Sequence, residues 1–170
     1  RRVVAFIIES LRRDHAREAF DCGEPGLNEY LTRYARQNDA RGLGRTYVAV
    51  PEGEDRVVGY YTLSAGGVAF AELPDHLRRR LPRYPIPVAH LGRLATCRSV
   101  RGQGLGEALL VDALKRSLRV ADELGIMALE VRAKTDQAKA FYEKYGFEAL
   151  LDDPLHLYLP LATARRALEP

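Results

Sequence analysis

The chain has 170 residues, of which 46% are hydrophobic and 29% are charged, and its net charge is +3. This length suits one domain that buries about two-thirds of its unfolded surface, and the composition is that of an ordinary globular protein. No apolar stretch approaches the ~20 residues that a membrane-spanning helix needs. The apolar run Val3–Ile8 is too short for a secretion signal. We therefore expect a single cytoplasmic domain over residues 1–170 with no membrane association.

The basic residues are 22 Arg and 4 Lys. The planar fork of arginine suits phosphate, which fits a nucleotide or RNA partner, but codon bias in a GC-rich genome explains the excess equally well. Cys22 and Cys97 match no metal-binding spacing and no disulfide framework. Two free thiols and no metal site are expected.

The first third of the chain predicts a strand followed by short helices. Val3–Ser10 is apolar and β-branched, as in an edge strand. From Arg12 to Asn38 the pattern is helical, and the Cys-Gly-Glu-Pro-Gly stretch at 22–26 predicts a break between two helices. One apolar stripe has spacings of three and four residues, at Leu27, Tyr30, Leu31, Tyr34 and Ala35.

A β-hairpin is predicted next, from Arg45–Val50 and Val57–Ser64 around a polar turn that contains Pro51 and Gly53. Residues 66–88 are interpreted as a long ordered loop with a short helical piece at 75–81, because their prolines force an extended path.

The second half alternates strands and helices. Strands are expected at His90–Thr96, Ile126–Val131 and Leu155–Leu161, the last one closing the chain. A long helix follows the first of these and runs to about Leu124, with Gly125 as a left-handed cap. A second helix begins after Thr135 as N-cap and ends before Gly146. This order predicts an α/β or α+β sheet domain.

A glycine-rich turn lies between the strand ending at Thr96 and the long helix. Arg101, Gly102, Gln103, Gly104, Leu105 and Gly106 make it up. Amide groups at a helix N-terminus have no intrahelical partner and attract anions, and glycines let the backbone approach a diphosphate. The turn has neither the Lys-Ser or Lys-Thr of a Walker loop nor the spacing of a dinucleotide fingerprint. Alone, it is as consistent with chain punctuation as with an anion site.

This turn resembles the R/Q-x-x-G-x-G/A signature of the GNAT acetyltransferase superfamily, and AKAFYEKYGF at 138–147 is similar to the Y-x-x-x-G-F of the same family. The resemblance implies the GNAT acyl-CoA N-acyltransferase fold, a mixed central sheet with helices on both faces, and acetyl-CoA as co-substrate. By this likeness the amides of 103–106 hold the pyrophosphate. The backbone of Leu94, Ala95 and Thr96 pairs with pantetheine.

The same resemblance implies that Tyr142 is the general acid that protonates the departing thiolate. A positioned acid contributes roughly 10²–10⁴ in rate. Ala138, Phe141, Tyr142 and Tyr145 also follow one helical stripe of the kind that usually packs in a core, and Phe141 and Tyr145 are assigned to packing. Thr135 stands where many relatives carry a pantetheine-binding Asn, and Cys97 stands where close relatives often have Asp.

A narrower resemblance covers almost the whole chain. FDCGEPGLNEYL at 20–31, GYYTLSAG at 59–66 and LPRYPIPVAHLGRLA at 81–95 are similar to the acetyltransferase toxins of bacterial type II toxin–antitoxin pairs. The likeness implies acetylation of the α-amino group of aminoacyl-tRNA by direct transfer, translation inhibition, a ribbon-helix-helix antitoxin and a homodimer. A free α-amine is partly neutral near pH 7, so no strong general base is required. His90 could act through water, or it could be a structural histidine.

Binding of tRNA requires a surface that holds phosphates. The candidate side chains are Arg78, Arg79, Arg80, Arg83, Arg93 and Arg98. The run at 78–80 is equally consistent with the solvated face of a short helix. An acetyltransferase acting on a small-molecule amine or a protein N-terminus is the alternative enzyme, and a CoA-binding regulatory module is the non-enzymatic one.

Overall fold

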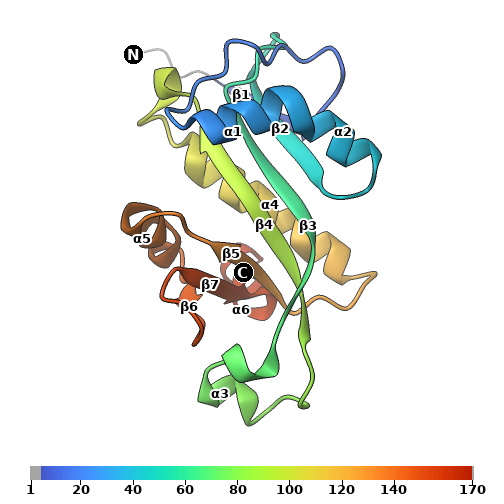
Figure 1. Ribbon diagram of the computed structural model, residues 1–170, viewed down its shortest axis with the longest axis vertical. Helices are drawn as coiled ribbons and strands as arrows, with labels where there is room; N and C mark the ends of the chain where they lie inside the picture. The colour runs from blue at the N-terminus through green and yellow to red at the C-terminus, as the bar shows by residue number, and fades with distance from the viewer. Residues whose placement is uncertain (1–4, 170) are drawn as a thin grey trace. The chain divides into compact units, whose positions relative to one another are not determined.

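The computed structural model describes residues 5–169 (Figure 1). Its strands are β1 (Phe6–Ser10), β2 (Arg45–Pro51), β3 (Gly59–Val68), β4 (Ile86–Thr96), β5 (Ala128–Arg132), β6 (Glu148–Ala149) and β7 (His156–Pro160). The α-helices are α1 (Pro25–Glu29), α2 (Ala35–Ala40), α3 (Asp75–Arg78), α4 (Leu105–Ala121), α5 (Asp136–Lys144) and α6 (Leu161–Leu168). Among the described residues, no helix combines the length and apolarity that crossing a membrane requires.

The strands form a seven-stranded mixed sheet in the order β1-β2-β3-β4-β5-β7-β6. β4 and β5 run parallel, whereas the pairs β1–β2, β2–β3, β5–β7 and β6–β7 are antiparallel. Contacts within the chain define two compact units. One unit comprises the described residues up to Ser64 together with Gly92–Ala113, and the other comprises Ala65–Leu91 and the described residues from Leu114 onward.

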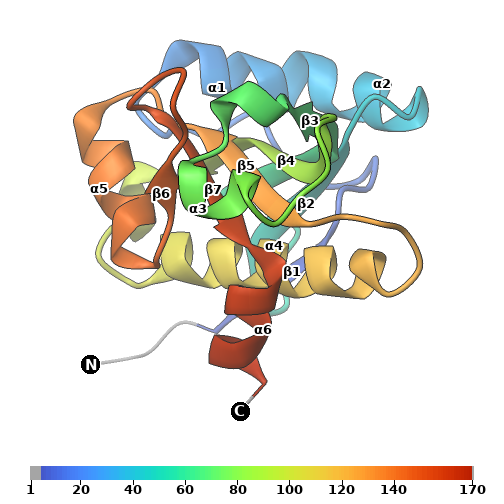
Figure 2. The same ribbon diagram turned by 90° about the horizontal axis from the view of Figure 1, so that it is seen from below.

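In the first unit, helices cover both faces of the sheet (Figure 2). The Tyr60 hydroxyl donates to the Leu27 carbonyl of α1 at 2.7 Å, so this face of β3 lies under α1. Successive strand residues point to opposite faces. The neighbouring Tyr61 accordingly reaches the other side, where its hydroxyl donates to Asp112 of α4 at 2.5 Å.

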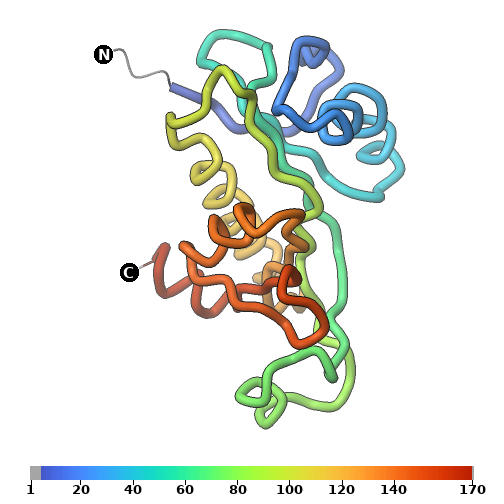
Figure 3. The backbone as a smooth tube through the Cα atoms, turned by 60° about the vertical axis from the view of Figure 1, so that its left-hand side comes forward, coloured from blue at the N-terminus to red at the C-terminus, as the bar shows by residue number. Residues whose placement is uncertain are grey.

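In the second unit, an apolar cluster holds β4, β5 and β7 together with the chain between β3 and β4. Its fully or nearly buried members are Val68, Leu73, Ile86, Val88, Ala128, Leu150 and Tyr158. The chain from Ala69 to Pro85 leaves the sheet, carries α3, and returns to it (Figure 3). Leu73 is fully buried and anchors this excursion.

Several expectations for the first half need correction. Between residues 5 and 24 no helix forms. Instead, residues 12–24 follow an irregular path with a bridge between Ala16 and Arg56. A continuous helical stretch then begins at Pro25 and passes through a π-helical segment, Tyr30–Tyr34, into α2. Proline suits this first turn because its missing N–H would have no partner there. The hairpin is confirmed, whereas the Val3 and Val4 of the predicted first strand lie outside the described residues.

The second half follows the predicted order of elements but differs in detail. β4 begins at Ile86 rather than His90, and β5 begins at Ala128 rather than Ile126. α4 ends at Ala121, where successive i to i−3 hydrogen bonds from Asp122 and Glu123 tighten the chain; Gly125 is not in the left-handed region and Leu124 is exposed. The short strand β6 was not predicted. The chain also continues past β7 into α6 rather than ending on a strand. The expectation of one domain over 1–170 stays a prediction.

Gly59 marks a close approach of β3 and α4 within the first unit. A Cβ at this position would lie 3.0 Å from Leu105 Cδ2, 3.1 Å from Leu109 Cδ1 and 3.4 Å from the Ala95 carbonyl oxygen. Because overpacking a buried contact costs roughly 1–3 kcal/mol, Gly59→Val is expected to lower the free energy of unfolding by that amount in urea denaturation. Gly26→Ala is the control, since its Cβ meets nothing and alanine favours the helix. Equal stability of Gly59→Val and wild type would contradict this close packing.

Candidate functional site

The glycine-rich turn is an exposed loop in which two glycines adopt left-handed backbone angles. Gly102 has φ +80° and Gly104 has φ +78°, and α4 begins directly after them at Leu105. Residues 101–104 are exposed, and a Cβ at either glycine would meet no atom within 4 Å. The first helical bond joins the Ala108 amide to the Gly104 carbonyl. The amides that precede it therefore have no intrahelical partner and are available to an anion.

The turn is tied to the segment before α1 by two arginines. Arg101 donates to the Cys22 carbonyl at 2.6 Å, and Arg98 lies 3.7 Å from Asp21. Gly23, with φ +94°, makes room for both, because a Cβ there would lie 3.2 and 3.3 Å from their guanidinium nitrogens. Arg101 thus ties the glycine-rich turn to Cys22, and Arg98 pairs with Asp21 of the same segment before α1.

β4 has an unpaired edge at its C-terminal end. Pairing with β5 runs from Val88↔Ala128 to Leu91↔Val131 and, within the described residues, ends there. β4 itself continues to Thr96. Leu94, Ala95 and Thr96 belong to this continuation, whose backbone groups on the β5 side have no strand partner. A ligand with amide groups can pair with such an edge, in the manner of an added strand.

Tyr142 lies near the end of α5 and is 7% exposed. Its ring packs on Phe141 and Phe147, with centroids 5.2 and 5.4 Å away. Burial raises the pKa of Tyr142 to about 12, so the phenol keeps its proton at neutral pH. At the other end of α5, the Thr135 hydroxyl accepts from the Ala138 amide at 3.1 Å, which confirms the predicted N-cap.

The second unit also contains a hydrogen-bonded chain of titratable side chains, of which the sequence analysis considered only His90. His90 Nδ1 lies 2.5 Å from Glu130 Oε1, and His156 Nε2 lies 2.6 Å from Glu130 Oε2. His156 Nδ1 lies 2.9 Å from Asp152. Glu130 and His156 are 6% and 3% exposed. The only signal in the sequence was a carboxylate in an otherwise apolar strand.

Glu130 should make stability depend on acid pH. Burial raises its pKa, but hydrogen bonds from His90 and His156 and the charge of His156 outweigh this effect, so the pKa lies below its usual 4.5. A lowered carboxyl pKa stabilises the fold above the unfolded value, and this stability is lost as pH falls through the folded value. We expect the stability difference between wild type and Glu130→Gln in urea denaturation to be larger at pH 7 than at pH 3. An equal stability difference at pH 7 and pH 3 would contradict a lowered pKa of Glu130 in the folded protein.

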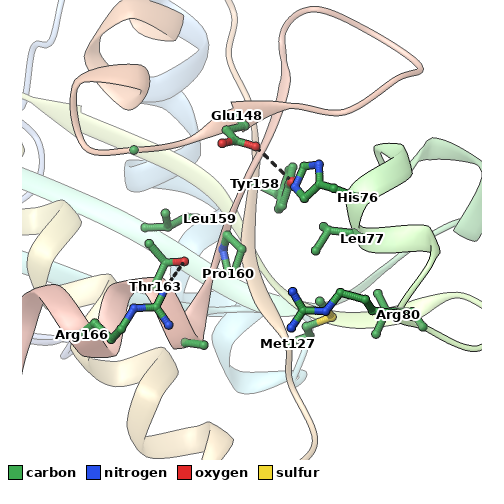
Figure 4. Close-up of a pocket in the computed structure, with 13 residues that line it drawn as sticks. His76, Leu77, Arg80, Met127, Glu148, Tyr158, Leu159, Pro160, Thr163 and Arg166 are labelled. Atoms are coloured by element: carbon green, nitrogen blue, oxygen red, sulfur yellow. Dashed lines mark hydrogen bonds between the residues drawn. The ribbon is translucent and has the colours of Figure 1, made fainter.

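The predicted phosphate-binding arginines of the second unit lie on and after α3. Arg78 pairs with Asp75, whereas Arg79, Arg80 and Arg83 are exposed. Arg80 also lines a pocket of about 400 Å³ between α3, β7 and α6 (Figure 4). Arg166 of α6 lines the same pocket, so the fold adds a cation that the sequence analysis did not consider.

Arg93, in the first unit, is held by an aromatic stack. Its guanidinium carbon lies 3.5 Å from the centroid of the Tyr30 ring, which is a cation–π geometry. Tyr30 in turn stacks on Tyr60 at 6.5 Å with an interplanar angle of 14°. Arg93 is therefore held against the π-helical segment Tyr30–Tyr34.

The turn and the β4 edge of the first unit each offer unpaired backbone groups to a ligand, and Tyr142 of the second unit offers a protonated phenol. The model of the acetyltransferase (GNAT) family matches residues 8–147, and the chain belongs to this family. This confirms the predicted fold and the prediction of an acetyltransferase.

Curated relatives and solved structures narrow the comparison. The chain is 44% identical over 147 residues to a tRNA-acetylating toxin of Mycobacterium tuberculosis, covering 86% of this chain and 87% of the toxin. It is 33% identical to a probable toxin TacT of Sinorhizobium fredii, covering 94% and 93%. Among solved structures, AtaT complexed with acetyl-methionyl-tRNAfMet has a TM-score of 0.90 and 32% identity over 96% of this chain and 99% of AtaT. A tyrosine-to-phenylalanine mutant of KacT has a TM-score of 0.91 and 30% identity, covering 96% and 99%.

Proposed function

We propose that this acetyltransferase transfers acetyl from acetyl-CoA to the α-amino group of aminoacyl-tRNA and thereby blocks translation, as the toxin of a toxin–antitoxin pair. The observation that carries this proposal is the 44% identity to a tRNA-acetylating toxin over 86% of the chain. The likeness of nearly the whole fold to AtaT, solved with acetyl-methionyl-tRNAfMet, supports it.

In this proposal the cofactor is bound mainly by backbone groups. The amides of Gln103–Gly106 hold the diphosphate of acetyl-CoA at the start of α4. The free edge of β4 at Leu94–Thr96 pairs with the pantetheine arm, and Thr135 at the start of α5 contributes a further hydrogen bond. Relatives of the AtaT group have been solved with acetyl-CoA bound, which supports this co-substrate.

Tyr142 acts on the leaving group during direct transfer between the two bound substrates. Burial raises the pKa of Tyr142 to about 12, above that of a thiol, so full proton transfer from the phenol to the departing thiolate would be uphill. The phenol therefore stabilises the developing thiolate chiefly as a hydrogen-bond donor in a dry environment, where such donors are most effective. Because burial keeps the phenol protonated, this donor is present throughout the neutral pH range.

The arginines supply the phosphate-binding surface for tRNA. Arg79, Arg80 and Arg83 are exposed in the second unit, and Arg166 adds a further charge beside Arg80. Arg93 and Arg98 supply the charges of the first unit. Phosphate contacts release counterions, so the affinity for tRNA should fall steeply with salt.

The partners in this proposal are a ribbon-helix-helix antitoxin and a second copy of the chain, and the compartment is the cytoplasm. Solved relatives include an AtaT mutant bound to the C-terminus of the antitoxin AtaR and the AtaT–AtaR complex bound to DNA. Light scattering of the purified chain, alone and with the candidate antitoxin, tests both interactions.

The experiment that tests the function is transfer of radiolabelled acetyl from acetyl-CoA to charged tRNA. Uncharged tRNA, polyamines and a peptide with a free N-terminus serve as competing acceptors. Label on charged tRNA alone would support the proposal. Label on the polyamines or the peptide would replace the acceptor with a small-molecule amine or a protein N-terminus while keeping the enzyme class.

A further inference from the structure

The carboxylate–histidine chain in the second unit connects three neighbouring strands and ends at the surface. His90 of β4 and Glu130 of β5 are register partners, and His156 of β7 lies two residues from Tyr158, the partner of Glu130. Residues two apart on a strand share a face, so the three side chains lie on one face of the sheet. Asp152, in the loop before β7, completes the chain.

The hydrogen bonds determine where the protons lie. Both oxygens of Glu130 are occupied, one by His90 Nδ1 and the other by His156 Nε2. A carboxylate only accepts, so each histidine donates to Glu130. Asp152 is a second acceptor, at His156 Nδ1. The arrangement that satisfies every contact therefore places a proton on His90 Nδ1 and protons on both nitrogens of His156.

This assignment leaves the lone pair of His90 on Nε2. The Nε2 atom has no hydrogen-bond partner in the part of the chain that the structure describes, and the His90 side chain is 35% exposed, in contrast to Glu130 and His156. A carboxylate that fixes one imidazole tautomer and leaves the other nitrogen free to accept a proton is the arrangement used to orient catalytic histidines.

The position of His90 relates it to the proposed chemistry. The β4–β5 pairing ends one residue further on, at Leu91↔Val131, and the unpaired edge assigned to pantetheine begins there. In the proposed binding mode the diphosphate lies at the turn after Thr96, so the thioester end of the cofactor lies toward the start of the unpaired edge. His90 immediately precedes that start along β4. Tyr142, the donor to the leaving group, belongs to the same unit as His90.

We propose that His90 is the proton acceptor of the acyl transfer, and that Glu130, His156 and Asp152 are positioning residues that hold its tautomer. The proposal rests on the proposed function. The amine nitrogen attacks the thioester carbonyl carbon, and a C–N bond forms. The C–S bond breaks, with its electron pair going to sulfur, where Tyr142 donates a hydrogen bond. The proton lost by the nitrogen goes to His90 Nε2, directly or through one water, and then to solvent.

Other charged groups lie near Asp152, at the end of the carboxylate–histidine chain that is farthest from His90. Arg132 of β5 lies 3.5 Å from Asp152. A carboxylate oxygen of Glu72, a carboxylate oxygen of Asp152 and a ring nitrogen of His156 all lie within 4.8 Å of one another. Arg132 balances the charge of Asp152, whereas Glu72 adds a second negative charge near it. Both groups lie at the far end of the hydrogen-bonded chain from His90, so neither competes for His90 Nε2.

The first test uses His90→Ala with added small bases. We expect kcat for acetyl transfer to charged tRNA to fall about 10²-fold, with KM for acetyl-CoA unchanged. Imidazole in the buffer should restore a large part of the rate. Pyrazole, which has the same shape but is a much weaker base, should not. Restoration by both would indicate cavity filling, and a wild-type rate in His90→Ala would overturn the proposal outright.

The second test examines the positioning residues through Glu130→Gln. The amide has one acceptor oxygen where the carboxylate had two, so it cannot accept from both histidines, and the negative charge that holds the Nδ1 proton of His90 is lost. We expect a loss of kcat similar to that of His90→Ala, without rescue by imidazole. The double variant, with His90→Ala and Glu130→Gln, should lose no more kcat than either single variant, because the effects of residues that act as a unit are not additive. Independent, additive losses would overturn the tautomer argument.

The two proposals can fail separately. If wild type acetylates an amine other than charged tRNA, the proposed acceptor is wrong, and the same variants are compared on that amine, because the nitrogen loses a proton in either case. If wild type acetylates charged tRNA and His90→Ala does so equally fast, the proposed function stands and the His90 proposal is wrong. Thermal denaturation of each variant shows that the folded protein is being compared.

Discussion

Tyr142→Phe is expected to lower kcat about 10²–10³-fold while leaving acetyl-CoA affinity unchanged. In the proposed mechanism the change removes one donor that acts only when sulfur departs, and interactions made only in the transition state affect kcat rather than binding. The fold should not suffer, because the Tyr142 hydroxyl has no hydrogen-bond partner among the described residues and its ring contacts remain. Steady-state kinetics together with calorimetric titration of acetyl-CoA measure both quantities.

Tyr145→Phe is the matched control for this variant. Tyr145 lies three residues further along, just past the end of α5, and packs edge-on against Phe141 with centroids 5.3 Å apart. This variant also loses one phenolic hydroxyl from the same aromatic cluster, but Tyr145 is assigned to packing rather than to catalysis. We expect wild-type turnover from it. A wild-type rate in Tyr142→Phe, or an equal loss in both variants, would remove Tyr142 from the mechanism.

Gly104→Ala should weaken acetyl-CoA binding about 10-fold. Its φ of +78° costs an L-residue roughly 1–2 kcal/mol, and a Cβ there would touch nothing, so the cost arises from the backbone alone. The alanine variant would escape this strain by turning the loop out of the conformation that presents its amides to the diphosphate. Titration of acetyl-CoA and of CoA should show the same loss, because both carry the diphosphate.

Gly42→Ala separates this effect from a general loss of stability. Gly42 has nearly the same φ, +74°, and equally open surroundings, but it lies in the turn before β2. We expect both variants to lose a similar amount of stability in thermal denaturation, and only Gly104→Ala to lose cofactor affinity. If Gly42→Ala weakens binding as much, the turn at 101–106 is not the diphosphate site.

The glycine turn and the start of α5 illustrate features that sequence alone could predict. Left-handed angles at Gly102 and Gly104 and the cap by Thr135 depend on residues within a few positions of one another. The local failures have local causes too. Pro25 starts the helix where a break was expected, and α4 closes with tight i to i−3 bonds before Gly125 could cap it. The predicted cofactor and tRNA contacts remain predictions, because they involve molecules outside the chain.

By itself, the sequence determined the acetyltransferase fold and the positions of the glycine-rich turn and of the helix that carries Tyr142, because each depends on a contiguous motif whose geometry follows from neighbouring residues. Only the tertiary structure decided the partners of His90. Glu130 is 40 residues away along the chain and His156 a further 26, and no spacing rule connects them. Their contact depends on the order and register of β4, β5 and β7, which are set by burial of apolar side chains throughout that unit. A histidine that appeared isolated in the sequence therefore became the end of a hydrogen-bonded chain in the fold.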